Sequence, residues 1–204
     1  YFHQSRMKKF TDNINIFLRD DKFDIKILSL IIKPPSIEEF YQNFKRCCPL
    51  EIYKKNNLYI KSFFKQIEKN AEGWVLKVLK NKTYNKLSIE QKSLLSVLLP
   101  NLCLVGNEKM IEIAYDFTLS KIMTIKMIGL NSCIKSEDKK TLYLLNQFYR
   151  EYSENQTVVE KWFTMMASNN FLKNGLKSVK SLLKHEKFDF KNPNLVRAVF
   201  GSFQ

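Results

Sequence analysis

The chain has 204 residues, of which 45% are hydrophobic and 13% aromatic, enough for one globular domain with a sizeable core or for one section of an elongated helical array. Glycine and proline number only five each, too few for the tight turns of a β-sandwich or β-barrel, so we exclude an all-β fold. The net charge is +14, but only five of the 34 basic residues are arginine, the residue that most often reads phosphate and guanine, so we do not expect nucleic-acid binding.

The first part of the chain predicts two amphipathic helices. Apolar residues recur at helical spacing over residues 5–20, and a second apolar run covers residues 25–32. Asp24 is placed to cap the start of this second helix, and Pro34 and Pro35 end it.

Two further helix starts follow. Ser36 and Glu39 form an S-x-x-E capping box, in which each residue satisfies a free backbone N–H of the first turn. Pro49 then opens a helix, and a separate amphipathic set lies at residues 74–79. The polar stretch 81–86 is the predicted loop.

The middle of the chain repeats the capping pattern. Ser88 and Gln91 precede a strongly apolar helix, which we expect Pro100 to kink. Gly106 ends this segment, because glycine readily adopts the backbone conformations that break helices.

Three more helices are predicted beyond this break. Residues 108–118 and 121–134 both carry helical apolar spacing. Ser136, followed by acidic residues that suit the positive end of a helix dipole, is the predicted start of the third.

The last part, residues 158–203, predicts three short amphipathic helices. Asn192 is placed as an N-cap and Pro193 as the first helical residue of the final helix. Altogether we expect ten or eleven helices of 10–16 residues. We predict a single all-α domain over residues 1–204, built as stacked antiparallel helix pairs in a superhelical array of the HEAT or armadillo kind.

The residues of catalytic chemistry are scarce. The two histidines, His3 and His185, stand in no H-E-x-x-H motif or zinc-ligand spacing, so we expect no cofactor or metal site in this chain. Cys103 and Cys133 lie in apolar runs and are expected to be buried packing residues, since a nucleophilic cysteine would need a histidine partner. The absence of paired cysteine motifs favours a reducing, cytoplasmic compartment. No apolar run reaches membrane-spanning length, so we expect no membrane contact.

Motifs near the C-terminal end resemble the C-terminal helical domain of the aminopeptidase N family, zinc-dependent alanyl aminopeptidases of the gluzincin group. The family pattern has a Lys-Trp-Phe helix, then L-x-H-x-x-F, then N-P-N followed by an arginine and a phenylalanine. The corresponding residues here are Lys161-Trp162-Phe163, then Leu183, His185 and Phe188, then Asn192-Pro193-Asn194, Arg197 and Phe203. Weaker matches extend upstream, including Asn101 through Leu104, Met123-Thr124 and the stretch after Asp24.

This resemblance implies that the chain is part of the C-terminal domain of a larger enzyme that removes N-terminal residues from peptides. In the family this domain walls and gates the substrate channel, and the zinc site belongs to a separate catalytic domain. The implied partners are that catalytic domain, on the same polypeptide, and peptide substrates.

The candidate contacts with the channel or with the catalytic domain are Arg197, Asn194, Lys161 and Trp162. Packing is the competing explanation for Trp162, which shares a helical face with apolar residues. For Arg197 we favour an ion pair with a neighbouring helix, since it lies outside the centre of the apolar stripe of its helix. Lys161 and His185 are expected at the surface or at helix caps.

A free-standing helical-repeat interaction scaffold without catalysis is the alternative function. The sequence upstream of Tyr1 would distinguish the two, because a zinc motif there would indicate the enzyme. We also expect some self-association, because an isolated section of a helical array exposes apolar surface where neighbouring helices would pack.

Overall fold

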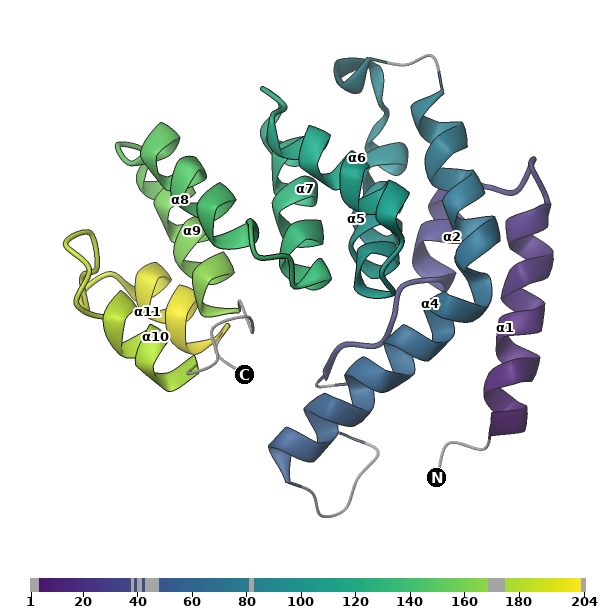
Figure 1. Ribbon diagram of the computed structural model, residues 1–204, viewed down its shortest axis with the longest axis horizontal. Helices are drawn as coiled ribbons and strands as arrows, with labels where there is room; N and C mark the ends of the chain where they lie inside the picture. Colours follow the sequence, from purple (N-terminus) through teal and green to yellow (C-terminus); the bar gives the residue numbers. More distant parts are fainter. Residues whose placement is uncertain are drawn as a thin grey trace. The chain divides into compact units, whose positions relative to one another are not determined.

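The computed structural model describes residues 4–37, 39, 42, 48–80, 83–168 and 175–202, and the regular secondary structure of these ranges is helical throughout (Figure 1). The predicted all-α class is therefore confirmed. The helices are α1 (Gln4–Arg19), α2 (Ile25–Ile31), α4 (Pro49–Leu79), the 3-10 helix η1 (Tyr84–Lys86), α5 (Ile89–Leu104), α6 (Glu108–Thr118), α7 (Met123–Ser136), α8 (Thr141–Tyr152), α9 (Gln156–Ala167), α10 (Gly175–Leu182) and α11 (Pro193–Phe200). Among the described residues, none of these helices is long and apolar enough to cross a membrane.

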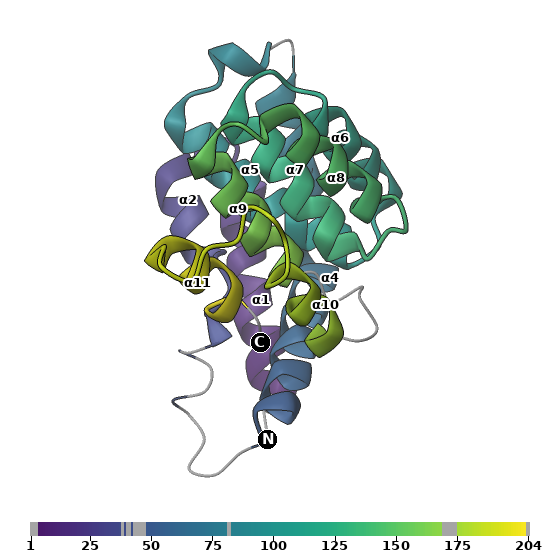
Figure 2. The same ribbon diagram turned by 90° about the vertical axis from the view of Figure 1, so that its left-hand side faces the viewer.

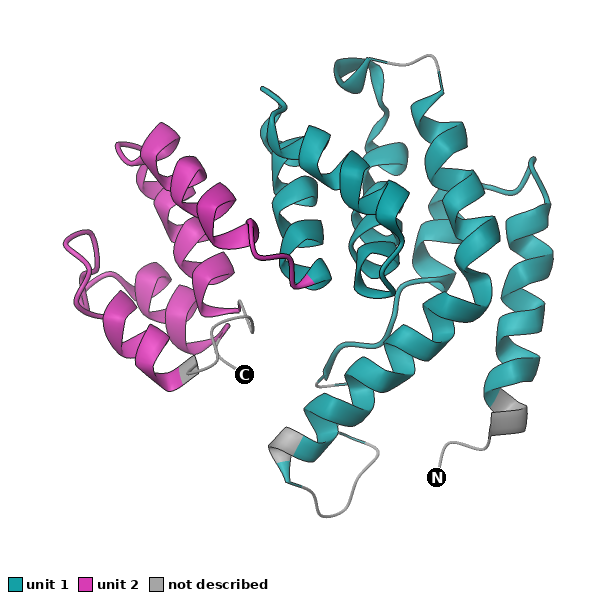
Figure 3. Ribbon diagram, viewed as in Figure 1, with its two compact units in different colours: residues 1–136 teal, residues 137–204 magenta. Residues whose placement is uncertain are grey.

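The chain divides into two compact units, residues 1–136 and residues 137–204 (Figure 3). Unit 1 holds α1 to α7, and unit 2 holds α8 to α11. That both units form one domain stays a prediction.

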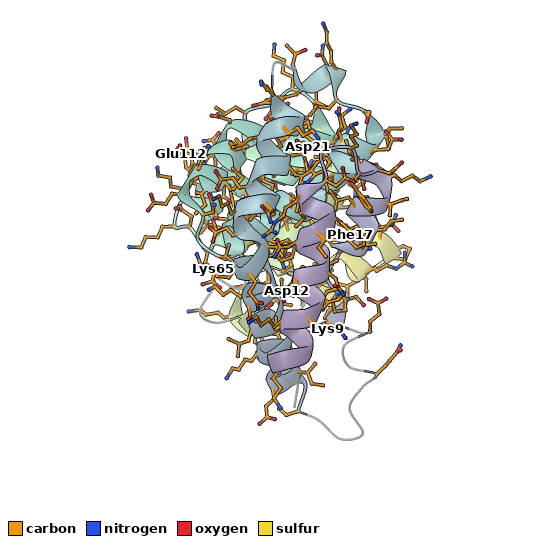
Figure 4. The ribbon with its side chains drawn as sticks, turned by 90° about the vertical axis from the view of Figure 1, so that its right-hand side faces the viewer. Lys9, Asp12, Phe17, Asp21, Lys65 and Glu112 are labelled. Carbon is orange, nitrogen blue, oxygen red and sulfur yellow. The ribbon has the colours of Figure 1, made fainter. Side chains whose placement is uncertain are left out.

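Unit 1 begins with a seam between α1 and α4, which run in the same direction (Figure 1). Phe10 stacks near Phe63 with ring centroids 5.6 Å apart, and the Trp74 indole N–H donates to the Leu18 carbonyl over 2.8 Å. A contact further along α1 is thus made with a residue further along α4, as expected for two parallel helices. Figure 4 looks onto this side, where Asp12 and Phe17 lie on α1 and Lys65 on α4.

The sequence predicted a helix from Pro49 and a separate amphipathic set at residues 74–79, but the structure joins them into α4, one helix of 31 residues. That separation was wrong because nothing between the two sets breaks the helix. Gly73 lies inside it on the exposed side, with open space around the position of a Cβ atom. The expected range of 10–16 residues is likewise too short for this helix.

The predicted capping boxes both form. The Ser88 side chain accepts from the Gln91 N–H, and the Gln91 side chain accepts from the Ser88 N–H, over 3.2 and 3.0 Å. In the same way, the Ser36 side chain accepts from the Glu39 N–H over 3.2 Å, and the Glu39 carboxylate accepts from the Ser36 N–H over 2.7 Å. The helix that Ser36 was expected to start lies largely outside the described residues.

The end of α5 also follows the sequence. Pro100 lies inside α5, one turn before its last residue. Gly106 then adopts a φ of 82°, a left-handed conformation that favours glycine, and ends the segment as predicted. The 3-10 helix η1 occupies part of the stretch predicted as a loop.

Helices α6 and α7 approach each other closely at Gly129. A Cβ atom at Gly129 would lie 2.7 Å from the Ala114 carbonyl oxygen, the Phe117 Cβ and the Thr118 nitrogen. Glycine is therefore required at this crossing, because any side chain would force the backbones of the two helices apart.

Ser136 was predicted to start a helix, and this was wrong: it is the last residue of α7. Its hydroxyl donates back to the Cys133 carbonyl over 2.8 Å, and Glu137 has a φ of 55°, which ends the helix. The next helix, α8, begins only at Thr141.

Unit 2 is organised around an aromatic core. The Tyr149 ring of α8 lies 4.7 Å from the Trp162 ring of α9, and Phe163 lies 5.6 Å from Phe188. From α11, which packs against α9, Leu195 and Val199 are buried as well. In both Figure 1 and Figure 2, α10 and α11 lie next to α9.

Candidate functional site

The candidate site lies on α9 and α11 of unit 2. Asn155 caps α9, because its side chain accepts from the Val158 N–H over 3.3 Å. The buried face of α9 is apolar, and its other side carries polar residues at the spacing i, i+3, i+4, i+7, which share one helix face. These polar residues are Thr157, Glu160, Lys161 and Thr164.

The final helix carries the same spacing. As the sequence predicts, Asn192 is the N-cap of α11, its side chain accepting from the Asn194 N–H over 2.9 Å, and Pro193 is the first helical residue. The residues of α11 and its C-cap at the spacing i, i+3, i+4, i+7 are Asn194, Arg197, Ala198 and Gly201. The two helices are also joined directly, because the Asn192 side chain donates to the Glu160 carboxylate over 3.3 Å.

These two sets of residues line a surface hollow of about 450 Å³, which we call the α9–α11 hollow. Three of the four residues singled out by the sequence, Lys161, Asn194 and Arg197, line it together. Its remaining lining residues are Thr157, Glu160, Thr164, Ala198, Gly201 and Ser202.

The two cationic side chains of the hollow have no anionic partner among the described residues. Lys161 and Arg197 are both exposed, and no ion pair joins either of them to a carboxylate in that part of the chain. The ion pair that we favoured for Arg197 is therefore not found there. The carboxylate of the hollow, Glu160, accepts a hydrogen bond from Asn192.

Trp162 is placed elsewhere. Only 4% of its surface is exposed, and its ring lies 5.0 Å from Phe163 and 5.2 Å from His185 in the aromatic core. It is absent from the lining of the hollow. The structure thus separates it from the other three candidates, in agreement with the packing explanation.

His185 differs from the expectation of a surface or capping residue. Its ring is half-buried and packs against Tyr149 and Phe163 as well as Trp162, while its Nδ1 accepts from the Lys187 N–H over 3.2 Å. Burial lowers the pKa of His185 below its ordinary value. The neutral ring is therefore favoured as a packing element of unit 2.

The cysteines offer little chemistry. Cys103 and Cys133 are buried, as predicted, and Cys48 is exposed. Burial raises the pKa of the Cys103 thiol, with a smaller contribution from Cys133, so the reactive thiolate form is disfavoured. Across the described ranges, no three His, Cys, Asp or Glu side chains are grouped to hold a metal ion, so these residues do not fit a zinc site.

Sequence reasoning missed Glu160, Thr157, Thr164 and Ser202 as members of the hollow. The signal that could have found the first three is the i, i+3, i+4, i+7 spacing around Lys161, repeated around Arg197. On α9 this spacing gives a polar stripe opposite an apolar face, whereas on α11 only Asn194 and Arg197 of the four positions are polar. Which two helices meet could not be read from the pattern.

Comparison with known proteins gives matches along nearly the whole chain. Residues 3–204 match the family described as "Domain of unknown function (DUF3458_C) ARM repeats". Aminopeptidase N of Escherichia coli is 23% identical over 199 residues, covering 94% of this chain and 22% of that protein. Aminopeptidase N of Haemophilus influenzae is 26% identical over 188 residues, covering 88% of this chain and 21% of that protein.

A solved structure shares the fold. The crystal structure of Legionella pneumophila aminopeptidase A in complex with aspartic acid matches with a TM-score of 0.78 and 22% identity, covering 96% of this chain and 24% of that one. The chain thus spans about a fifth of the length of the curated relatives that it matches.

Proposed function

The chain belongs to the DUF3458_C family of ARM-repeat domains, and from its similarity to aminopeptidase N we propose that it serves as the C-terminal helical domain of a zinc-dependent aminopeptidase. The resemblance to aminopeptidase N that the sequence motifs indicated is confirmed by the matches to two proteins of that name. The ARM-repeat description likewise agrees with the helical array expected from the sequence.

One observation carries this proposal: almost the entire chain aligns with only about a fifth of each aminopeptidase N. A segment of that size matches one domain of a much longer enzyme. The reaction of the whole protein would be the hydrolytic release of N-terminal residues from peptides. The zinc ion, which would supply Lewis-acid activation of the scissile carbonyl and of water, would belong to the catalytic domain.

The part of this chain in that function would be to wall and gate the channel by which peptides reach the catalytic domain. The α9–α11 hollow supports such a role, because Lys161, Asn194 and Arg197 all line it and are exposed, and neither cation has an ion-pair partner among the described residues. Exposed donors without partners in their own fold are suited to contact a passing peptide or a neighbouring domain. Trp162 would contribute indirectly, by fixing α9 through the aromatic core.

The decisive experiment starts from the coding sequence upstream of Tyr1. The longer polypeptide and the present chain would each be assayed on an alanyl arylamide, after chelation and after restoring zinc. We expect zinc-dependent turnover by the longer polypeptide and none by the chain alone. Robust turnover by the chain alone would contradict the proposal, and an upstream sequence without a peptidase domain would favour the interaction scaffold.

The channel role needs a separate test in the longer enzyme. R197Q should raise KM for a decapeptide about fivefold and leave the kinetics on the small arylamide unchanged, since only the long substrate would reach the hollow. R150Q is the matched control, because Arg150 is another exposed arginine of unit 2 that does not line the hollow. Equal effects of both substitutions on both substrates would contradict a channel role for Arg197.

Self-association of the chain is a further expectation. Large apolar side chains are exposed on several helices and in the turn before α11, and burying them between copies would remove apolar surface from water. They include Ile16, Leu30, Leu58, Leu176, Phe190 and Phe200. Light scattering at increasing concentration should show a rising average mass, whereas a constant monomer mass would contradict this expectation.

A further inference from the structure

The α9–α11 hollow combines two fixed helices with a set of side chains that is rich in hydrogen-bond donors. Lys161 and Arg197 are donors only, since an ammonium and a guanidinium have no lone pair to offer. Both project from helices whose opposite faces are buried, so the positions of their Cα atoms are set by the core of unit 2. The backbone around the hollow is therefore held in place by the core of unit 2, and two cationic side chains line the hollow.

The acceptors of the hollow are fewer and partly occupied. Its one carboxylate, Glu160, already accepts from the Asn192 side chain over 3.3 Å. The Thr164 hydroxyl donates to the Glu160 backbone carbonyl over 3.1 Å. Within the described residues, neither cation is neutralised by an ion pair. An incoming anion would thus meet two free positive charges and one carboxylate that is held by an amide.

The donors of the hollow indicate which anions could bind. A guanidinium presents parallel N–H groups that match two oxygens of a carboxylate or a phosphate, and such charge-assisted pairs are stronger than neutral hydrogen bonds. The Asn194 side chain and the Thr157 and Ser202 hydroxyls, which line the same hollow, can add neutral hydrogen bonds. This arrangement suits a small planar anion with room for the chain that carries it.

We propose that the α9–α11 hollow binds a carboxylate group of a peptide, held by Arg197 and Lys161. The assignment of a peptide as the carrier rests on the proposed function, whereas the assignment of a carboxylate rests on the side chains alone. The carboxylate belongs either to the C-terminus of the peptide or to an Asp or Glu side chain, and both present the same two oxygens. Removing Arg197 removes the paired donors, and removing Lys161 removes the second charge.

The test is a titration of the chain followed by NMR chemical shifts at low ionic strength. Three probes separate the sources: N-acetyl-tetraglycine as the free acid, the same peptide as its C-terminal amide, and an N-acetyl-Gly-Gly-Asp-Gly amide. We expect the free acid to bind about fivefold more tightly than the amide, as a charge-assisted pair requires. Equal binding of the aspartyl amide and the acid would indicate that either carboxylate is accepted, and a preference would identify the source.

Matched substitutions locate the binding. R197Q should weaken binding of the acid about tenfold and K161M a few-fold, with no change for the amide. The controls R150Q and K184M remove the same charges from exposed positions of unit 2 that do not line the hollow, and should change binding less than about twofold. Far-UV circular dichroism of each variant should be unchanged, because all four side chains are exposed.

Three results would overturn the proposal: equal affinities for acid and amide, equal losses in R197Q and R150Q, or tighter binding of inorganic phosphate than of the acid. These outcomes are independent of the proposed function. Binding is measured on this chain, whereas peptidase activity is measured on the longer polypeptide, so either result can fail while the other holds.

Discussion

The α1–α4 seam of unit 1 and the α9–α11 seam of unit 2 are both lined by polar side chains, but they use them differently. In unit 1 the Thr11 hydroxyl contacts the Gln66 side chain over 2.8 Å, and the Asn70 side chain donates to Asn15 over 2.8 Å. In unit 2 Lys161, Asn194 and Arg197 face the hollow without ion-pair partners among the described residues. Polar groups that bind each other hold helices together, whereas unpaired ones are left available to a ligand.

The two tryptophans repeat this contrast. The Trp74 indole N–H in unit 1 donates to the Leu18 carbonyl, and the Lys77 ammonium lies 4.2 Å from the centre of its ring. The Trp162 indole N–H in unit 2 is buried without a hydrogen-bond partner in the described part of the chain. The indole N–H of the buried tryptophan thus joins two helices of unit 1, whereas the buried tryptophan of unit 2 contributes through its aromatic contacts.

The largest expected effect is a loss of stability from a substitution at Gly129, where α6 and α7 approach each other closely. Gly129→Ala should lower the free energy of unfolding by about 3 kcal/mol, because its Cβ would meet backbone atoms of α6 that cannot move independently. Gly73→Ala is the matched control, also inside a helix but with open space around it, and should raise stability by about 0.5 kcal/mol. Urea unfolding measures both, and equal effects would contradict the close approach of α6 and α7.

The second prediction compares the loss of stability caused by replacing each of the two tryptophans with phenylalanine. Trp74→Phe should cost about 2–3 kcal/mol, since it leaves the buried Leu18 carbonyl without its donor and a smaller ring in the core. Trp162→Phe should cost only about 1 kcal/mol, because it removes similar volume but no hydrogen bond among the described residues. The difference in urea midpoints tests the contrast, and a larger loss in Trp162→Phe would reverse it.

A smaller effect is expected from the seam asparagines. Asn15→Ala should lower stability by about 1 kcal/mol, because it removes the acceptor of Asn70. Asn194→Ala should change stability by less than about 0.5 kcal/mol, since that side chain is exposed and lines the hollow. Thermal unfolding of both variants measures this, and a marked loss in Asn194→Ala would show that the hollow has a structural role.

The smallest expected effects are changes of stability with pH, and they occur in different pH ranges in the two units. Burial lowers the pKa of His185 below its ordinary value of 6.5. As the pH falls, the unfolded chain therefore binds a proton at this histidine before the folded chain does. The contribution of neutral His185 to stability is present above pH 6.5 and declines as the pH falls through that value. A hydrogen bond from Asn107, with help from Lys109, lowers the pKa of Glu72 below 4.5, so its contribution is present above that value and is lost as pH falls further.

The two tryptophans can report these windows separately. Trp162→Phe leaves Trp74 as the fluorescent probe of unit 1, and Trp74→Phe leaves Trp162 as the probe of unit 2. Between pH 7.5 and 5.5, the urea midpoint reported by Trp162 should fall, and His185→Gln should remove that decline. An unchanged midpoint at Trp162 over this range would contradict the burial of a neutral His185.

Local sequence signals determined much of this fold. Capping residues such as Ser88, Asn192 and Asp24 act within their own first turn, so their helix starts are readable from adjacent residues. The prediction for Ser136 was wrong because a serine hydroxyl can also donate to a carbonyl of the preceding turn, as Ser136 does at the end of α7. The 31-residue length of α4 was missed because residues 74–79 were interpreted as a separate amphipathic set, whereas the helix from Pro49 continues through them without a break.

The sequence by itself also determined three members of the candidate site. Lys161, Asn194 and Arg197 stand out by their match to the family motifs, and Arg197 also by its place outside the centre of the apolar stripe of its helix. Only the tertiary structure decided that they share one hollow, that Glu160 is held by Asn192, and that Trp162 faces the core instead. The physical reason is that periodicity fixes which residues share a helix face, whereas the packing of distant apolar faces decides which polar faces meet.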